Sequence, residues 1–330
     1  MERIATVTFD AVRTTLIVTL LFVPMVVAHA QIASPFGPAA AWLVDEGDSL
    51  LRHNKPQKAL LKFNEALELD PTATNYAARA RAWIMLDRMD RVLLDAEQAL
   101  KLDSTHAEAN HQRALYAFRS DDFRLADRLT TRALNNGARG RWRDKLLILR
   151  GESRAELKRA SEAIADLKAG LGDRTDDLAA LKTLARLLDG TSDHAASLAV
   201  LEKLCVVEPG DIGNWTNRGF ELASLGRHQE ALAIYAKALA MDKDEPTALS
   251  NRAWSLMELG RKEEALSDVQ RSLRSYPANA FALRTRALLR IGMGQRDKAC
   301  EDLHLARVIG GVADVPQLIA KHCAGLEPKR

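Results

Sequence analysis

Histidine is the side chain best suited to bind a metal or move a proton near neutral pH, and seven histidines follow the first thirty residues. They are His53, His106, His111, His194, His228, His304 and His322. None belongs to an H-E-x-x-H arrangement, and the three cysteines include no C-x-x-C pair. His106 and His111 lie five positions apart, which does not place them on one helical face. The sequence therefore predicts no metal site and partly exposed histidines.

Motifs of nucleophilic and nucleotide-dependent enzymes are missing from the sequence. It contains neither the G-x-S-x-G elbow of a serine hydrolase nor the G-x-x-x-x-G-K-[ST] loop of a nucleotide-binding protein. The acidic run "MDKDEP", residues 241–246, lacks the glycine and glutamate of a calcium loop. We predict no catalytic residues, no cofactor and no enzymatic activity.

The first thirty residues have the pattern of a secretory signal peptide. Arg3 and Arg13 precede the apolar run "LIVTLLFVPMVV", residues 16–27, which ends in the small-residue sequence Ala28–Ala30. The run is shorter than the ~20 residues that span a bilayer. We predict cleavage after Ala30, export, and no stable membrane insertion of the mature chain; an uncleaved anchor is the alternative.

Export determines how the three cysteines are interpreted, because disulfides form in oxidising compartments. Cys300 and Cys323 lie 23 positions apart, and a bridge between them would stabilise the chain by about 3 kcal/mol on the chain-entropy model. Two buried thiols in neighbouring helices are the alternative. The third cysteine, Cys205, must then be buried or free.

Composition and charge favour an ordered helical protein. Among the 330 residues, 47% are apolar and 28% charged, and Ala, Leu and Arg, which are good helix formers, dominate. The formal net charge of +3 is small for this length. Since nucleic-acid binders normally carry a pronounced basic excess, we predict no nucleic-acid partner.

A 34-residue period runs through the chain. Small residues in "NWTNRGFELASLGRHQEALAIYAKALAMDK", residues 214–243, recur at this step in the two following segments. The matched sets are Gly219, Ala253 and Ala287; Gly226, Gly260 and Gly294; and Ala231, Ala265 and Ala299. A period of 34 residues with two helical patterns resembles the tetratricopeptide repeat family, with Trp215 and Tyr235 at the aromatic columns and proline closing repeats at Pro71, Pro209 and Pro277.

The resemblance implies an all-α fold, a right-handed α-solenoid of about eight helical hairpins with a C-terminal capping helix, because single repeats cannot bury their apolar faces alone. We expect units beginning near Ala40, Ala73, Ala107, Asp144, Leu178, Ile212, Pro246 and Ala280. The predicted organisation is a signal peptide (1–30), a short linker (31–39), units 1–3 with a longer connecting turn (40–143), units 4–8 (144–311), and a capping helix with a tail (312–330).

Two segments interrupt the period. The segment "NNGARGRWRD", Asn135–Asp144, adds three residues and predicts a longer turn or a slight bend between units 3 and 4. After unit 8, a turn leads to a predicted capping helix, Val315–Cys323. This ending resembles those of other exported bacterial repeat chains, and the resemblance favours the Cys300–Cys323 bridge.

The family resemblance also implies a concave groove. We number the positions of each unit as columns, counting from the expected first residue of the unit given above. The groove is then lined by columns 2, 5, 6, 9 and 12 of the first helices. In units 6–8 the candidate groove residues are Asn217, Phe220, Asn251, Trp254, Met257, Phe281, Arg284, Leu288 and Ile291. An amide such as that of Asn217 or Asn251 both donates and accepts, so it can pair with any peptide group. Packing of Phe220 and Trp254 against the following unit is the alternative to ligand binding.

These patterns predict a non-enzymatic module that binds a peptide or helix of another, unidentified protein in its concave groove. The bacterial periplasm is the expected location. The alternative is a structural assembly factor of the cell envelope that acts through self-association or through its convex face.

Overall fold

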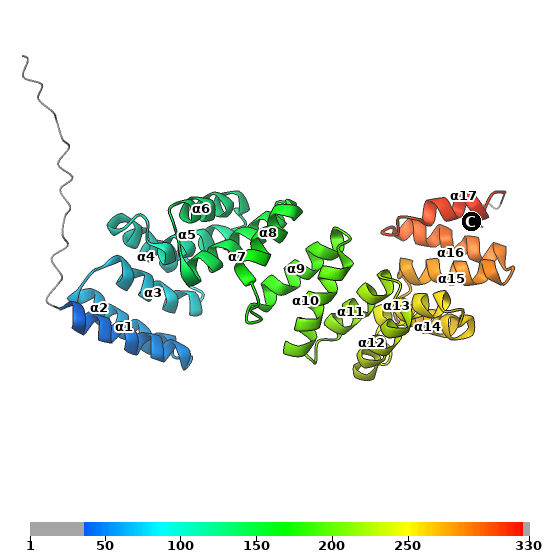
Figure 1. The fold of residues 1–330 in the computed structure, drawn as a ribbon, viewed down its shortest axis with the longest axis horizontal. Coiled ribbons are helices and arrows are strands. Elements are labelled where there is room, and N and C mark those ends of the chain that lie inside the picture. The colour runs from blue at the N-terminus through cyan, green and yellow to red at the C-terminus, as the bar shows by residue number, and fades with distance from the viewer. Residues whose placement is uncertain (1–35, 326–330) are drawn as a thin grey trace, which may run out of the picture.

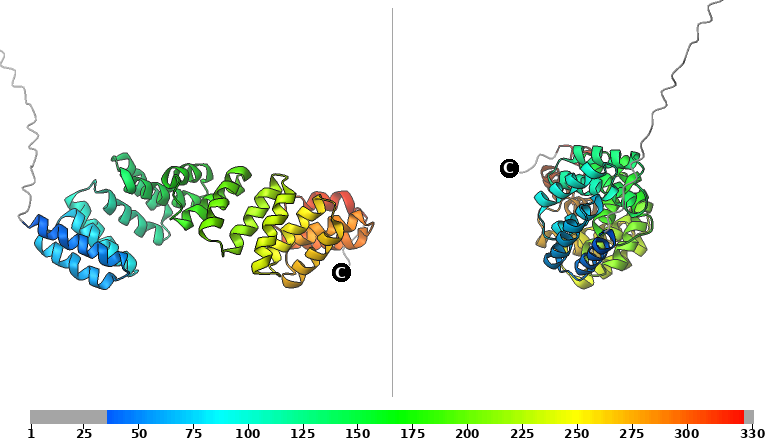
Figure 2. Two further views of the ribbon diagram at one scale, coloured as in Figure 1. Left: turned by 60° about the horizontal axis from the view of Figure 1, so that its bottom comes forward. Right: turned by 90° about the vertical axis from the view of Figure 1, so that its left-hand side faces the viewer.

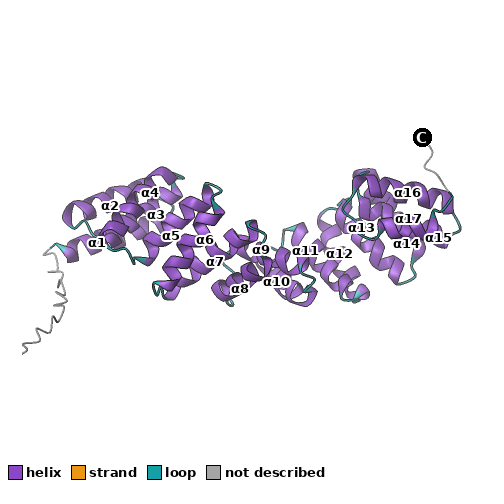
Figure 3. Ribbon diagram, turned by 90° about the horizontal axis from the view of Figure 1, so that it is seen from above, coloured by secondary structure: helices purple, strands orange, loops and turns teal. Residues whose placement is uncertain are grey.

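The structure, a computed structural model, describes residues 36–325. The predicted signal peptide and most of the predicted linker lie outside the described residues. Within residues 36–325 the regular elements are seventeen α-helices, joined by short loops with no strand (Figure 3). They are α1 (Gly37–Arg52), α2 (Pro56–Leu69), α3 (Ala73–Met85), α4 (Met89–Leu102), α5 (Ala107–Arg119), α6 (Phe123–Asn135), α7 (Gly140–Glu156), α8 (Ala160–Leu171), α9 (Leu178–Gly190), α10 (His194–Val207), α11 (Ile212–Ser224), α12 (His228–Met241), α13 (Pro246–Glu258), α14 (Lys262–Ser275), α15 (Ala280–Gly292), α16 (Arg296–Ile309) and α17 (Val315–His322).

Consecutive helices pair into eight hairpins, units 1 to 8, which run from α1–α2 to α15–α16. Each helix packs on the next, and most first helices also contact the first helix of the following unit. The result is an elongated α-solenoid with α1 at one end and α17 at the other (Figure 1). Seen along the long axis, the units wind around one another rather than forming a flat row (Figure 2).

Six first helices begin at the residues expected from the period, and two do not. Helix α1 begins at Gly37, three residues before the expected Ala40, because Pro38 fits the first turn of a helix. Helix α7 begins at Gly140, so the expected long turn Asn135–Asp144 is largely helical. Trp142 belongs to this added helical turn and lies 5.5 Å from the His111 ring.

The turn inside every hairpin has the same backbone conformation. Column 15 has positive φ in all eight units; in units 6–8 it is Gly226, Gly260 and Gly294, with φ of 74° to 76°. In units 1–5 the equivalent residues are Asn54, Asp87, Asp121, Lys158 and Ser192, with φ of 53° to 61°. Glycine adopts this conformation at no steric cost, whereas a side chain there is strained. The turn is therefore fixed by the hairpin geometry, and glycine is only its most favourable residue.

Small residues at column 8 allow the two helices of a hairpin to approach closely. A Cβ on Gly219 would lie 2.4 Å from a ring carbon of Tyr235, whose side chain is fully buried. Gly47 and Phe63 form the same pair in unit 1, where the corresponding distance is 2.5 Å. In units 7 and 8, alanine at column 8 accompanies a smaller partner. In units 1 and 6 the glycine therefore makes room for the aromatic ring of the second helix.

A buried ion pair joins the two helices in four units. Arginine at column 7 makes two hydrogen bonds, of 2.6 to 2.9 Å, with aspartate at column 23, and the four aspartates are buried. The pairs are Arg79–Asp95, Arg150–Asp166, Arg252–Asp268 and Arg286–Asp302. Unit 1 reverses the charges, with Lys62 Nζ 3.5 Å from Glu46. Paired contacts of this kind fix helix register as well as charge.

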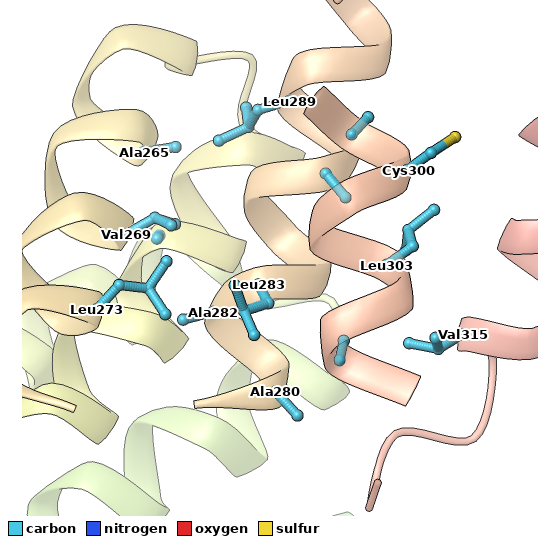
Figure 4. Packing of buried hydrophobic residues seen from close by; sticks show 14 of the residues in the cluster. Ala265, Val269, Leu273, Ala280, Ala282, Leu283, Leu289, Cys300, Leu303 and Val315 are labelled. Carbon is cyan, nitrogen blue, oxygen red and sulfur yellow. The ribbon is translucent and has the colours of Figure 1, made fainter. Parts of the chain in front are cut away.

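The solenoid ends in a cap that is tied down at several points. A disulfide joins Cys300 on α16 to Cys323 after α17, with Cα atoms 5.6 Å apart. Arg296 also donates to the backbone carbonyls of His322 and Ala324, at 2.5 and 2.8 Å. Side chains of α14, α15, α16 and α17 gather in one core (Figure 4). Cys205 is a free, buried thiol.

Among residues 36–325, no helix combines the length and the apolar character that a membrane span requires.

Candidate partner-binding groove

The nine predicted groove residues lie on α11, α13 and α15, the first helices of units 6–8. Asn217 is exposed and Asn251 is half-buried. Neither side-chain amide has a hydrogen-bond partner among the described residues. Both amides are therefore available to a ligand, with one donor group and one acceptor each.

Five of the nine residues line a pocket of about 280 Å³ near the C-terminal end of the solenoid. The lining residues are Phe220, Ser250, Asn251, Trp254, Phe281, Arg284, Thr285, Val312, Ala313 and Asp314. The rings of Phe220 and Trp254 lie 6.2 Å apart, and the ring of Phe281 is 55% exposed. The Ser250 side chain is buried at the pocket without a hydrogen-bond partner. The aromatic wall with polar groups beside it suits an apolar side chain attached to a peptide backbone.

Arg284 does not offer a free positive charge in this pocket. Its Nε lies 2.9 Å from each carboxylate oxygen of Asp314, in the loop that precedes α17. The charge-assisted pair holds this loop over the end of the groove. Arg284 thus shapes the pocket wall, and its charge is largely balanced.

Asn217 and Phe220 line a second, more polar pocket of about 410 Å³. Its other lining residues are Lys182, Thr183, Ala185, Arg186, Asp189, Ser197, Leu201, Leu204, Asp211, Gly213, Asn214 and Glu221. Helices α9 and α11 contact each other less than any other pair of successive first helices in the solenoid. The pocket lies beside this junction. Because Phe220 lines both pockets, they form one continuous surface from α9 to Asp314, which we call the C-terminal groove.

Met257, Leu288 and Ile291 line neither pocket. Met257 and Ile291 pack against the core formed by units 7 and 8 and the cap, and Leu288 is half-buried. Column 12 lies near the end of the first helix, where the side chain meets the neighbouring unit. The C-terminal groove therefore excludes these three residues.

The groove also contains residues that were not among the candidates. Lys182, Arg186 and Asp189 occupy columns 5, 9 and 12 of unit 5, so extending the column rule by one unit would have found them. Asp314 has no repeat column, because it belongs to the loop after unit 8. Only the folded chain shows it beside Arg284.

Four polar side chains at the equivalent columns of units 1–3 form contacts within the protein. Arg81 Nη1 lies 2.6 Å from Asp48 Oδ2, and Arg81 Nε lies 3.2 Å from Glu108 Oε1. The Gln112 amide, at column 6 like Asn217 and Asn251, donates to the carbonyl of Ala77 at 2.8 Å. Side chains that already pair internally offer fewer groups to a partner. Among the column 6 amides, those of Asn217 and Asn251 therefore remain without a partner in the described residues, whereas that of Gln112 does not.

Glu108 is a buried carboxyl whose protonation should affect stability. Burial is the largest cause that raises its pKa to about 7, and the Arg81 charge opposes this shift. Between the ordinary pKa of 4.5 and about 7, the folded state therefore holds a proton that the unfolded state has lost. This contribution to stability is complete below pH 4.5 and falls as pH rises through 7.

Glu108→Gln is expected to remove this loss. The variant should match the wild type near pH 4.5 and exceed its free energy of unfolding by about 1–3 kcal/mol at pH 8, because the neutral amide needs no desolvation of charge. Urea unfolding at several pH values measures the difference. Glu301→Gln, at an exposed position, is the control and should follow the wild-type profile. Equal stability of Glu108→Gln and wild type at pH 8 would contradict the assignment.

The fold defines a class of protein, an α-solenoid of helical-hairpin repeats, and the C-terminal groove lies mainly along its first helices. Residues 217–280 match the family described as "Tetratricopeptide repeat". This segment, from α11 to the first residue of α15, contains Asn217, Phe220, Asn251 and Trp254 of the groove, and Phe281 lies one residue beyond it. Over these residues the chain is similar to tetratricopeptide repeats, a protein-interaction fold.

Two curated relatives share part of the sequence. The chain is 36% identical over 93 residues to the tetratricopeptide repeat and J domain-containing co-chaperone DNJ1 of Cryptococcus neoformans, covering 28% of this chain and 18% of that protein. It is 34% identical over 74 residues to sperm-associated antigen 1 of Mus musculus, covering 22% and 8%. The chain thus spans less than a fifth of either relative.

Solved structures similar to the chain include other repeat proteins. A tetratricopeptide repeat protein from Parabacteroides merdae aligns with a TM-score of 0.48 at 13% identity, over 77% of this chain and 99% of that one. MamA from AMB-1 aligns with a TM-score of 0.46 at 18% identity, over 52% and 92%.

Proposed function

We propose that this protein is a non-enzymatic interaction module that binds a segment of another protein along the C-terminal groove. The observation that carries the proposal is the pair of unpartnered amides, Asn217 and Asn251, one repeat apart on neighbouring first helices. An extended peptide backbone needs donors and acceptors at regular intervals, and amides in successive repeats supply both. The proposal does not depend on the sequence of the bound segment.

The aromatic pocket beside the amides gives the groove a means of selecting its ligand. Trp254 and Phe281 would contact an apolar side chain of the bound segment, and burial of such a side chain contributes about 1.5–3 kcal/mol. Ser250 adds a hydroxyl inside the same pocket. We therefore infer that the bound segment carries a large apolar residue where it passes α13 and α15.

We also propose that the protein is exported and acts in the bacterial periplasm. The charge and hydropathy pattern of residues 1–30 supports export. The Cys300–Cys323 disulfide supports an oxidising compartment, because such bridges are rare in the cytosol. Isolation of the protein from fractionated cells, with the N-terminal residue determined, tests both points. A cytosolic protein that begins at Met1 would contradict them.

The groove is tested by selecting short random peptides on the wild-type chain and measuring their affinity for variants. Asn217→Ala combined with Asn251→Ala should weaken a selected peptide at least tenfold, since each amide hydrogen bond contributes about 1 kcal/mol. Circular dichroism should be unchanged, because neither amide has a hydrogen-bond partner among the described residues. The control is Val308→Ala on the second helix α16, a residue that is 80% exposed. Equal effects of the two variants would contradict a groove site.

Self-association is a second candidate, favoured by apolar residues on the second helices. Val206 on α10 and Val308 on α16 occupy the same repeat column, and both are 80% exposed. Light scattering over a range of concentrations tests this candidate. A monomer at every concentration would exclude it, whereas a dimer lost in a Val206→Ser, Val308→Ser variant would support it.

A further inference from the structure

Three side chains from three helices converge at the junction between units 5 and 6. Asp189 lies in the last turn of α9, His194 is the first residue of α10, and Glu221 lies on α11. The His194 Nδ1 atom is 2.8 Å from Glu221 Oε2 and 3.8 Å from Asp189 Oδ1. One nitrogen or oxygen atom from each residue can be chosen so that all three lie within 4.8 Å of one another. The junction therefore brings one imidazole and two carboxylates to a single point.

Glu221 is a buried carboxylate without a lysine or arginine partner among the described residues. Its side chain is 2% exposed, and its neighbours are His194 and the hydroxyl of Ser197, which donates at 2.7 Å to Oε1. The nearby Lys182 is instead paired with Glu208 and Asp211, each at 2.8 Å. A buried charge without a fixed counter-ion is costly. A cation held beside Glu221 would supply this counter-charge.

The three residues are not part of the packing that the repeat requires. In unit 6 the same columns hold Ala223, His228 and Ser255, so the histidine recurs without either carboxylate. In unit 7 they hold Met257, Lys262 and Leu289. No other unit combines the three groups at these columns, although every unit forms the same hairpin. The cluster is thus specific to the unit 5–unit 6 junction.

We propose that Asp189, His194 and Glu221 form a binding site for one divalent transition-metal ion of the zinc type. Histidine nitrogen and carboxylate oxygen bind Zn²⁺ at about 2.0–2.2 Å, and three protein ligands leave the fourth position to water. Neighbouring ligands of a tetrahedral ion lie about 3.4 Å apart at these bond lengths. The separations from His194, 2.8 and 3.8 Å, lie on either side of that value, and the separation of the two carboxylates is at most 4.8 Å.

Neighbouring groups orient the proposed metal ligands, and the pocket gives them access to solvent. The hydroxyl of Ser197 holds one oxygen of Glu221, which orients the other oxygen toward the His194 nitrogen. Asp189 and Glu221 both line the open pocket between α9 and α11, so the ion and its water have access from solvent. In the bound state His194 is neutral, with its proton on Nε2.

A bound ion would connect α9 and α10 of unit 5 to α11 of unit 6. This is the junction at which the first helices approach least closely, and it flanks Asn217 and Phe220. The ion would therefore stiffen one end of the C-terminal groove. Asp189 and Glu221 also line the groove, but the metal site does not depend on the proposed peptide ligand, because its test measures Zn²⁺ binding alone and changes neither Asn217 nor Asn251.

The test is calorimetric titration of the purified, tag-free chain, treated with a chelator, with Zn²⁺. We expect one ion per chain, together with a rise in melting temperature on adding Zn²⁺, because an ion that binds only the folded state stabilises it. Mg²⁺, which prefers six oxygen ligands, should not compete. His194→Ala and Glu221→Gln should each weaken Zn²⁺ binding at least tenfold. His228→Ala, the equivalent histidine one repeat later, should leave it unchanged.

Two results would overturn the proposal. One is the absence of a Zn²⁺-dependent signal in the wild-type chain. The other is Zn²⁺ binding by Glu221→Gln with wild-type affinity. This variant preserves the size of the side chain and its contact with Ser197, so the test remains valid even if His194→Ala does not fold. Replacement by Co²⁺ adds a direct readout: an absorption band from a four-coordinate ion, present in wild type and in His228→Ala and lost in Glu221→Gln, supports the site.

Discussion

Replacing Asp268 with alanine is expected to lower the free energy of unfolding by about 3 kcal/mol, the low end of the range for breaking a buried ion pair. The Asp268 carboxylate is buried and makes two hydrogen bonds with Arg252, at 2.6 and 2.8 Å. Without this carboxylate, the Arg252 guanidinium stays between α13 and α14, and no other carboxylate replaces its two hydrogen bonds. The effect is at the low end because a quarter of the Arg252 side chain is exposed. Urea unfolding followed by circular dichroism measures the loss.

The matched control replaces both partners. Unit 5 fills the same two columns with Leu184 and Val200, so Arg252→Leu combined with Asp268→Val transfers a pair that the chain already uses. Apolar residues often substitute for a buried ion pair without loss of stability. We expect the double variant to recover most of the stability that Asp268→Ala loses. A double variant as unstable as the single one would mean that the charges themselves are required.

Gly219→Ala is the second change with a large expected effect, about 3 kcal/mol at the upper end of ordinary overpacking. The added methyl group would lie 2.4 Å from a Tyr235 ring carbon, closer than any normal contact. The ring is fully buried and has no free space into which it can turn. The hairpin α11–α12 must therefore separate. Thermal unfolding and amide exchange in these two helices report the change.

Two further variants separate the contact from the loss of glycine. Gly219→Ala with Tyr235→Leu reproduces the pair Ala287 and Leu303 of unit 8, and it should recover most of the lost stability. Gly292→Ala is the control at a helix position where a Cβ meets nothing within 4 Å, and it should change stability by less than about 0.5 kcal/mol. If Gly219→Ala is as mild as Gly292→Ala, the close approach in unit 6 is not required.

The sequence predicted the hairpins well because their contacts are periodic. Small residues at columns 8, 20 and 27 determine where two helices meet, and these residues are visible as a 34-residue period. The starts of α1 and α7 were harder to predict from the sequence, because helix ends depend on local packing such as that of Trp142 with His111. The positive φ at Lys158 and Ser192 was also missed, because the hairpin imposes a conformation that these residues do not favour alone.

The candidate site was only partly predictable, since a groove involves contacts between units. The groove columns implied by the family resemblance pointed to Phe220, Asn251 and Trp254, which line the aromatic pocket. They could not show that Arg284 binds Asp314, which lies outside the repeats. His194 is partly exposed, as expected, but the sequence did not show its contact with a carboxylate 27 positions away. The arginine and aspartate of columns 7 and 23 lie sixteen residues apart in the sequence, but only the folded hairpin shows that they form an ion pair.

The central claim is that the C-terminal groove receives a segment of another protein, and site-specific photo-cross-linking in cells tests it most directly. A photoreactive residue would replace Trp254 in the groove or Val308 on the exposed surface of α16, in otherwise identical full-length chains. We predict a discrete cross-linked partner from position 254, reduced by Asn217→Ala with Asn251→Ala, and none from position 308. Cross-links from position 308 alone, or only to a second copy of the chain, would contradict the claim.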